Sequence, residues 1–322
     1  MPHIRYGPDN PEATYVSHGY EERLCDLGEI QMNYVSAGSR DKPALLLIPG
    51  QTESWWGYEA ALPLLEDDFQ VFAVDLRGQG RSTRTPGRYT WDNIGNDLVR
   101  FIDLAIGRPT LAAGLSSGGV IAAWLSAYAK PGQVRAAYYE DPPLFASETR
   151  PAVGHSIRQS VVGPMFALWA KYLGNQWSVG DFEGMLRARS EEVSPNLVNP
   201  VSGRPPGGAP SPTPPQNLKE YDPEWGAACW TGSISAGCDH ATMLAAVKCP
   251  VLFTHHSRRT SDDGTFMGAI SDLQVTRVRA LVESAGQTFT YLDFPKMPHS
   301  MHGADPEQYA RVVKEWAGGL RG

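Results

Sequence analysis

Apolar residues occur in seven short runs whose patterns predict β-strands. The run at 29–38 alternates apolar and polar residues, which is typical of a strand with one buried face. The runs at 43–50 and 69–75 are continuously apolar, as in strands that are buried on both faces of a parallel sheet. Four later runs complete the set of predicted strands: 110–115, 135–140, 250–256 and 289–294.

Between these runs, apolar residues recur at helical spacing. Residues 117–129 are apolar nearly all round, which predicts a helix buried within the fold. Asp305 and Pro306 have the character of an N-cap and first turn, so they predict the start of a closing helix. An apolar stripe in 90–105 consists of Trp91, Ile94, Leu98, Phe101, Ile102 and Ala105. The alternation predicts an α/β fold, with a mostly parallel central sheet flanked by helices on both sides.

The alternation stops between residues 144 and 246. This segment contains helical patterns with no strand between them, so we expect a helical insertion. Within it, residues 199–215 are rich in proline and glycine and predict a surface loop. The predicted organisation is a core formed by residues 1–143 and 247–322, interrupted by a helical unit at 144–246.

Composition excludes several classes of partner. The 322 residues include 42% hydrophobic ones, enough for a full core, and the net charge is −7. Lysine and arginine are scattered, so neither a nucleic acid nor an anionic membrane surface is expected as a partner. The N-terminal segment has no apolar stretch after a basic start, and no run is long enough to span a bilayer. We therefore expect a cytoplasmic protein, and a homo-oligomer is compatible with the sequence.

The four cysteines give no sign of a metal or redox site. Cys25, Cys229, Cys238 and Cys249 include no C-x-x-C pair. We expect free, mostly buried thiols in a reducing compartment, with a Cys229–Cys238 disulfide as the alternative. The G-x-G within 74–83 lacks the third glycine of a dinucleotide fingerprint, and no cofactor is expected.

One glycine-rich turn carries candidate chemistry. Residues 114–118, Gly-Leu-Ser-Ser-Gly, fit G-x-S-x-G and lie between a predicted strand and a predicted helix. Such a turn is so sharp that its central residue is strained, and only small neighbours let the surrounding backbone approach. It would hold the hydroxyl of Ser116 above the sheet edge, next to a helix N-terminus. Ser116 is therefore the candidate nucleophile, although an ordinary glycine-rich turn can fit the same five-residue pattern.

A serine nucleophile needs an imidazole base, and the late candidates are His299 and His302. Both follow the last predicted strand, from which a loop can reach back over the sheet edge. His299 lies seven residues before Pro306, whereas His302 is nearer to the closing helix. We favour His299 as the base and expect His302 to be a structural or solvated loop histidine.

The carboxylate that orients the base has two candidate positions. Glu140 and Asp141 lie at the carboxyl end of a predicted strand, at the edge where the serine turn also lies. Asp262 and Asp263 follow the next predicted strand, in a segment with the composition of a polar hairpin or loop. Composition and position alone leave both alternatives open.

An oxyanion that forms at the serine needs two hydrogen-bond donors. The first is the backbone N–H of Ser117, which follows the nucleophile. A second predicted strand ends in Pro49-Gly50-Gln51, and the backbone N–H of Gln51 can face that of Ser117 across the nucleophile. We expect these two groups to form the oxyanion hole.

Several motifs together resemble the α/β-hydrolase superfamily. They are D-x-R-G-x-G-x-S at 75–82, G-x-S-x-G at 114–118 and the late histidine. The resemblance spans most of the chain outside the insertion. It implies that the insertion, which follows the sixth strand of that fold, is a cap domain over the active site.

A narrower resemblance is to zearalenone lactonases, particularly the actinobacterial type. In that family the acid is a glutamate after the sixth strand, which implies Glu140 and leaves Asp141 outside the triad. The family also places a cap tryptophan against the aromatic lactone, which implies that Trp225 binds substrate. The resemblance rests on the stretches "SWWGYE", "VFAVDLRGQGRST", "SSGGVIAAWLSAYAKPGQVRAAYYEDPPLFASE" and "NLKEYDPEWG".

The resemblance implies a serine hydrolase that opens the ester bond of a macrocyclic resorcylic acid lactone through an acyl-enzyme. The expected triad is Ser116, His299 and Glu140, and the expected ligand is a small apolar lactone. A general carboxylesterase or a carbon–carbon bond hydrolase with the same triad is the first alternative. A ligand receptor that keeps the fold and turns over slowly or not at all is the second.

Overall fold

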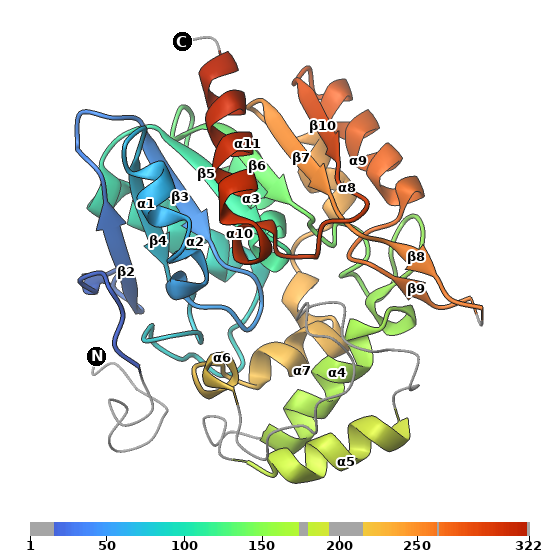
Figure 1. Ribbon diagram of the computed structural model, residues 1–322. Coiled ribbons are helices and arrows are strands. Elements are labelled where there is room, and N and C mark those ends of the chain that lie inside the picture. The colour runs from blue at the N-terminus through green and yellow to red at the C-terminus, as the bar shows by residue number, and fades with distance from the viewer. Residues whose placement is uncertain (1–15, 174–179, 193–214, 263, 321–322) are drawn as a thin grey trace.

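The computed structural model describes residues 16–173, 180–192, 215–262 and 264–320 (Figure 1). Strands and helices alternate along this chain as the hydrophobic pattern predicts. The predicted loop at 199–215 lies outside the described residues except for Pro215, so its conformation stays a prediction.

Eight strands form one mostly parallel sheet in the order β1-β2-β4-β3-β5-β6-β7-β10. The β1–β2 and β2–β4 pairs are antiparallel, and the other neighbours are parallel. A separate antiparallel pair, β8–β9, forms the expected polar hairpin. All seven predicted strands are confirmed, and β1 is an edge strand that the pattern did not indicate. The strands are β1 (Arg23–Asp26), β2 (Gln31–Ala37), β3 (Ala44–Ile48), β4 (Gln70–Val74), β5 (Thr110–Leu115), β6 (Val134–Glu140), β7 (Val251–His255), β8 (Arg259–Thr260), β9 (Phe266–Met267) and β10 (Phe289–Asp293).

Helices cover both faces of the sheet, which confirms the predicted fold class. α1 and α11 pack on one face, and α2, α3, α8 and α9 pack on the other (Figure 1). The closing helix begins as predicted, because the Asp305 side chain accepts a hydrogen bond from Gln308 N at 2.9 Å. The helices of these two layers are α1 (Leu62–Leu65), α2 (Trp91–Phe101), α3 (Ser117–Tyr128), α8 (His240–Ala245), α9 (Asp272–Ser284), α10 (Met301–Ala304) and α11 (Pro306–Gly319). Short 3-10 or π segments are η2 (Trp55–Tyr58), η3 (Ile102–Ile106), η4 (Ile157–Gln159), η5 (Trp169–Leu173) and η6 (Ser233–Ser235).

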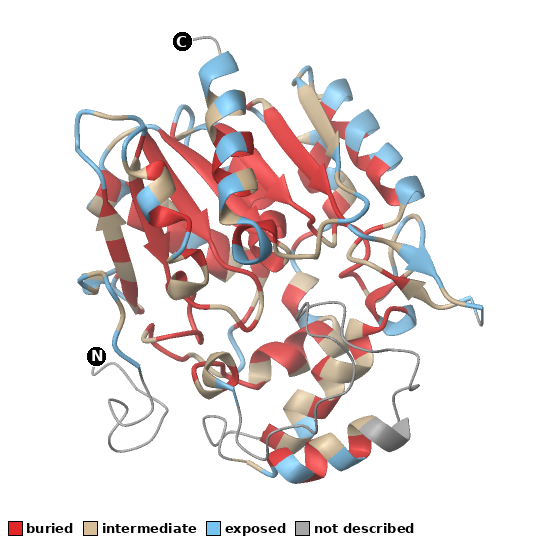
Figure 2. Ribbon diagram, viewed as in Figure 1, coloured by how far each residue is buried: buried red, intermediate tan, exposed pale blue. Residues whose placement is uncertain are grey.

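The central strand β3 shows why its sequence is apolar throughout. Leu46 and Ile48 pack into the layer that contains α2 and α3, whereas Leu45 and Leu47 pack into the layer that contains α1 and α11. Successive side chains of a strand point to opposite faces, so a sheet covered on both sides leaves no polar position. The inner strands of the sheet, β3 to β7, are accordingly largely buried, whereas the edge strand β1 and the outer helix faces are largely exposed (Figure 2).

The described elements between β6 and β7 are all helical, in agreement with the expected insertion. α4 (Val162–Leu168), α5 (Phe182–Glu192), α6 (Gln216–Lys219) and α7 (Glu224–Thr231) lie together below the sheet in Figure 1. The last helix of the segment, α8, instead packs against α3 and α9 in the core layer. The exact limits of the insertion stay a prediction.

Backbone hydrogen bonds clasp the insertion to the loop at 75–82. Gly80 N donates to Glu220 O and Asp222 N donates to Gly78 O, each at 2.8 Å. Gln79 and Tyr221 therefore face each other across a short antiparallel bridge. The motif D-x-R-G-x-G-x-S is thus bonded directly to the helical insertion.

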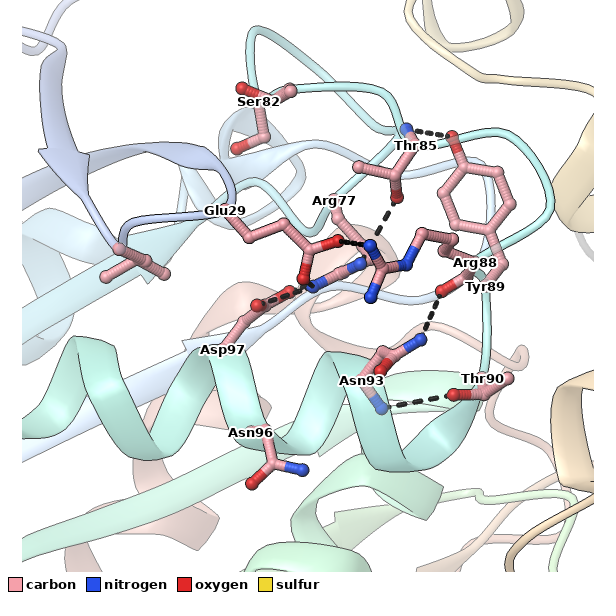
Figure 3. Close-up of polar contacts among 12 residues, drawn as sticks. Glu29, Arg77, Ser82, Thr85, Arg88, Tyr89, Thr90, Asn93, Asn96 and Asp97 are labelled. Carbon is pink, nitrogen blue, oxygen red and sulfur yellow. Dashed lines mark hydrogen bonds and ion pairs between the residues drawn. The ribbon is translucent and has the colours of Figure 1, made fainter. Parts of the chain in front are cut away.

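A buried ion pair holds the same loop against α2. The Arg77 guanidinium donates to both carboxylate oxygens of Asp97, at 2.6 and 2.7 Å (Figure 3). Glu29 Oε2 lies 3.4 Å from Arg77 Nη2, and Thr85 Oγ1 lies 3.3 Å from Nη1. The two hydrogen bonds fix the orientation of Arg77 relative to Asp97, in addition to pairing their opposite charges.

The described part of the chain contains no helix with the length and apolar character needed to cross a bilayer. All four cysteines are free thiols, and three of them are buried, as expected. Among the described residues, no cluster of three histidine, cysteine or acidic side chains has the geometry of a metal site.

Removing the Asp97 charge tests the importance of this pair. Asp97→Asn removes the bidentate counter-ion of the buried Arg77 guanidinium, leaves only the more distant Glu29, and should lower the free energy of unfolding by about 3 kcal/mol. Glu21→Gln, which breaks the exposed pair with Arg23, is the control and should leave the free energy of unfolding nearly unchanged. Urea unfolding of both variants checks the difference, and equal effects would contradict a structural role for Arg77.

Candidate active site

The predicted nucleophile sits in a strained turn between β5 and α3. Ser116 has φ 54° and ψ −120°, a backbone conformation that a side chain with a Cβ rarely adopts. Its N–H donates to Glu140 O at 2.8 Å, which ties the turn to the end of β6. The residue is partly exposed, which is compatible with the predicted nucleophile.

Two glycines make the turn sterically feasible. A Cβ on Gly114 would lie 2.1 Å from Gly118 O, closer than any side-chain atom can approach a backbone oxygen. A Cβ on Gly118 would lie 2.3 Å from Ile48 O and 2.6 Å from Pro49 O. The first turn of α3 is therefore pressed against the end of β3, where the loop containing Gln51 begins.

This contact brings the two predicted oxyanion donors to neighbouring segments. Ser117 opens α3 beside the nucleophile, and Gln51 follows the carbonyls that Gly118 touches. The side chain of Gln51 is fixed by the cap, because its Nε2 donates to Tyr221 Oη at 2.5 Å. Cys229 Sγ also donates to Gln51 Oε1 at 3.4 Å. The cap thus holds the loop on which the second donor lies.

The structure pairs the favoured base, His299, with Asp141 and not with Glu140. His299 Nδ1 donates to Asp141 Oδ2 at 2.6 Å. Asp141 follows β6 with φ 41°, and its Oδ1 accepts from His256 N at 3.1 Å. The expected Glu140–His299 contact is therefore corrected: the carboxylate that orients His299 is one residue further along the chain.

Glu140 instead binds the other late histidine. Its Oε2 accepts from His302 Nδ1 at 3.0 Å, and its Oε1 accepts from the backbone N of Met301 at 2.6 Å. The physical reason is local: Glu140 is the last residue of β6, and the positive φ of Asp141 turns the chain, so the two carboxylates diverge. Sequence spacing cannot distinguish two adjacent acids whose directions depend on one backbone angle.

The protonation states also favour His299 over His302 as the base. Burial lowers the pKa of His302, but the nearby charges of Glu140 and Glu53 outweigh it and raise the pKa to about 10. At neutral pH His302 is therefore an imidazolium that has no lone pair to accept a proton. Burial also lowers the pKa of His299, while the hydrogen bond and charge of Asp141 raise it above its ordinary value.

The Nε2 atom of His299 is the nitrogen left to accept a proton, since Nδ1 is engaged by Asp141. No hydrogen bond joins Ser116 Oγ to either late histidine in the described structure. Such contacts are often long before substrate binds. His256 directly follows β7. Its Nδ1 donates to the carbonyls of Pro298 and His299 at 3.0 and 2.9 Å, which fixes the loop that carries His299.

Of the two alternative acids after β7, Asp262 makes no hydrogen bond to either late histidine in the described structure. Asp262 is exposed, in the connection between β8 and β9. Asp263 lies outside the described residues. The residue directly after β7 is His256 and not an acidic residue, and its imidazole is hydrogen-bonded to the loop that carries His299.

Trp225 is not available to a ligand in this structure, which corrects the expectation that it binds substrate. Its side chain is fully buried, and its Nε1 donates to Arg77 O at 2.8 Å. The indole stacks on Tyr89 at 5.6 Å between ring centroids and meets Trp91 edge-on at 6.3 Å. The residue therefore anchors the cap to the loop at 75–82, because all its surface is used in packing.

An alanine at position 118 tests the steric argument. Gly118→Ala should displace the serine turn, slow labelling of Ser116 by a fluorophosphonate roughly 100-fold, and cost about 1–3 kcal/mol of stability. Gly318→Ala is the control, since nothing lies within 4 Å of a Cβ at that position in α11. Labelling at the same rate in both variants would show that the packing against β3 is not required.

Part of the chain is similar in sequence to curated hydrolases. Human Epoxide hydrolase 4 is 33% identical over 114 residues, which cover 35% of this chain and 31% of the relative. The 3-oxoadipate enol-lactonase 2 of Acinetobacter baylyi is 33% identical over 101 residues, which cover 30% of this chain and 37% of the relative. The matched segments thus span about a third of the length of these curated relatives.

The fold is also shared over nearly the whole chain. The solved enol-lactonase of Burkholderia xenovorans LB400 superimposes with a TM-score of 0.58 at 17% identity, covering 92% of this chain and all of the other. The model described as "Alpha/beta hydrolase family" matches residues 45–312, which include the serine turn and both late histidines. The chain belongs to the α/β hydrolase family.

Proposed function

We propose that this protein is a serine hydrolase in which Ser116 is the nucleophile, His299 the base and Asp141 the carboxylate that orients the base. The observation that carries this assignment is the 2.6 Å hydrogen bond between a buried carboxylate and a histidine on the loop after β10. It is supported by the strained conformation of Ser116, which is typical of a nucleophile held at a strand-to-helix turn. Asp141 takes the place that the family resemblance gives to Glu140.

The first half of the reaction forms an acyl-enzyme. Ser116 Oγ attacks the carbonyl carbon of the ester while its proton passes to His299 Nε2. Asp141 fixes the tautomer of the imidazole and stabilises the imidazolium. The backbone N–H groups of Gln51 and Ser117 donate to the oxyanion, and losing one such donor typically costs about 3–4 kcal/mol of barrier. The bond to the leaving oxygen then breaks, and His299 returns the proton to that oxygen.

The second half releases the acid. In a lactone, the acyl-enzyme remains tethered to its own leaving alcohol. Water must therefore attack the acyl carbon, with His299 taking its proton, before the alcohol closes the ring again. The bond between the acyl carbon and Ser116 Oγ then breaks, and His299 returns the proton to Oγ, which regenerates the serine. Exclusion of the alcohol oxygen from the base after ring opening is thus part of what the cap has to achieve.

We infer that the substrate is a macrocyclic resorcylic acid lactone, zearalenone. Support comes from the stretches of core and cap that resemble zearalenone lactonases, and from the enol-lactonase among the relatives. Aromatic side chains of the cap near the site fit a flat, apolar ligand. Trp169, which is partly buried and meets Tyr221 edge-on at 5.7 Å, is the tryptophan we now favour for ligand contact.

The product formed from zearalenone tests the substrate class. Wild-type protein should convert zearalenone to a product heavier by one water, and Ser116→Ala should abolish turnover while leaving binding intact. Mass spectrometry of parallel incubations with p-nitrophenyl acetate and a vinylogous diketone separates the alternatives. Turnover of only the small ester indicates a general carboxylesterase, turnover of only the diketone indicates a carbon–carbon hydrolase, and a single turnover indicates a receptor.

Substitution of the two adjacent acids tests the triad. Asp141→Asn should reduce kcat by roughly 10⁴-fold, because the imidazole loses the group that fixes its tautomer. Glu140→Gln should lower stability, because it leaves His302 with one counter-ion fewer, and should reduce kcat far less than Asp141→Asn, because it keeps the carboxylate bonded to His299. Asp262→Asn, on the exposed hairpin, is the control and should behave as wild type. If folded Glu140→Gln protein loses kcat as Asp141→Asn is expected to, the assignment of the acid is reversed.

A further inference from the structure

Three charged side chains form a buried row beside the base loop. His302 Nδ1 lies 3.0 Å from Glu140 Oε2, and His302 Nε2 lies 3.5 Å from Glu53 Oε1. The side chains of His302 and Glu140 are completely buried, and that of Glu53 is 24% exposed. A cation between two carboxylates is a stable arrangement only when both anions are close, as they are here.

Each carboxylate of the row also holds a backbone segment. Glu53 Oε2 accepts from Gly50 N at 3.0 Å, immediately before the predicted oxyanion donor Gln51. Glu140 Oε1 accepts from Met301 N, two residues after His299. The row therefore links the loop after β3 to the loop that carries the base, through a single imidazolium.

The loop after β3 is strained and needs such support. Thr52, between Gln51 and Glu53, has φ 64°, which is an unfavourable backbone conformation for a β-branched residue. Strain of this kind persists only where surrounding contacts fix the chain. One of these contacts is the hydrogen bond from Gly50 N to the carboxylate of Glu53, and another is the hydrogen bond from the Gln51 side chain to Tyr221.

The imidazole of His302 is itself packed rigidly. It stacks on Tyr58 with 3.8 Å between ring centroids, and Tyr58 Oη donates to Ile48 O at 2.9 Å. Ile48 O is the carbonyl against which Gly118 packs. The histidine is thus connected by direct contacts to the strand end that supports the serine turn.

We propose that Glu53, acting through His302, is a positioning residue that fixes the oxyanion loop at Gln51 relative to the loop carrying His299. This inference rests on the proposed serine hydrolase function. Neither Glu53 nor His302 touches the reacting atoms. Their effect is on the relative placement of an oxyanion donor and a base that belong to different loops.

The same row adds negative charge near the base. The charged or titratable groups that face His299 and its loop are Asp141, Glu140, Glu53, His256 and His302. Burial lowers the pKa of His299, whereas Asp141, then Glu140 and Glu53, raise it. Removing the charge of Glu53 should therefore lower the pKa of the base, and the acid limb of the kcat/KM profile should move to lower pH.

Glu53→Gln is the direct test, with Glu59→Gln as its matched control. Glu59 follows in the same segment and pairs with His18 at 2.8 Å, away from the base loop. We expect Glu53→Gln to reduce kcat roughly 10- to 100-fold with little change in KM, and to shift the acid limb downward. Glu59→Gln should leave both unchanged. Rates with the ester substrate and fluorophosphonate labelling of Ser116 are measured across pH, beside urea unfolding.

Glu53→Asp and a double variant complete the design. Glu53→Asp keeps the negative charge, but its shorter side chain reaches less far toward Gly50 N. It should therefore lower kcat and leave the acid limb of the kcat/KM profile as in wild type. This variant also replaces Glu53→Gln if Glu53→Gln does not fold. In the His302→Gln background, Glu53→Gln should add little further loss, because the link is already broken.

Unchanged kcat and acid limb in folded Glu53→Gln protein overturns the positioning role, as do fully additive effects of Glu53→Gln and His302→Gln. Failure of the proposed function is a distinct result. In that case wild-type protein itself shows neither ester turnover nor fluorophosphonate labelling at Ser116.

Discussion

The close contact between the first turn of α3 and the end of β3 is the constraint on which the site depends. Gly118 touches the carbonyls of Ile48 and Pro49, so neither segment can shift without the other. This contact holds Ser116 in its strained turn and sets the start of the loop that contains Gln51. Because the strain is local and the packing around it is extensive, the fold stabilises a serine conformation that an isolated turn would not keep.

Two adjacent carboxylates at the end of β6 serve two different histidines. Asp141 orients His299, whose second nitrogen remains available, whereas Glu140 and Glu53 enclose His302 and keep it protonated. His299 and His302 are only three positions apart in the sequence, but the charged groups around them differ. His302 is therefore enclosed by two carboxylates that raise its pKa, whereas His299 is bonded to one carboxylate through Nδ1 and is the proposed base.

The helical insertion is joined by hydrogen bonds to the loop at 75–82 of the core. Its segment at 220–222 pairs with the loop at 78–80, and Trp225 fills the space behind that loop. Tyr221 then reaches the side chain of Gln51 at the edge of the site. The helical insertion is thus bonded to the loop that contains Gln51 as well as to the motif D-x-R-G-x-G-x-S.

The sequence by itself determined seven of the eight sheet strands, the mostly parallel sheet flanked by helices, the serine turn and the pair of late histidines, because the hydrophobic period and the glycines of the turn are local features of the chain. The order of the strands in the sheet came only from the structure. The sequence also placed the acid at the end of β6 or after β7. Only the tertiary structure decided that Asp141 faces His299, that Glu140 faces His302 and that Trp225 is buried. These outcomes depend on single backbone angles and on contacts between segments more than 100 residues apart, which no local pattern encodes.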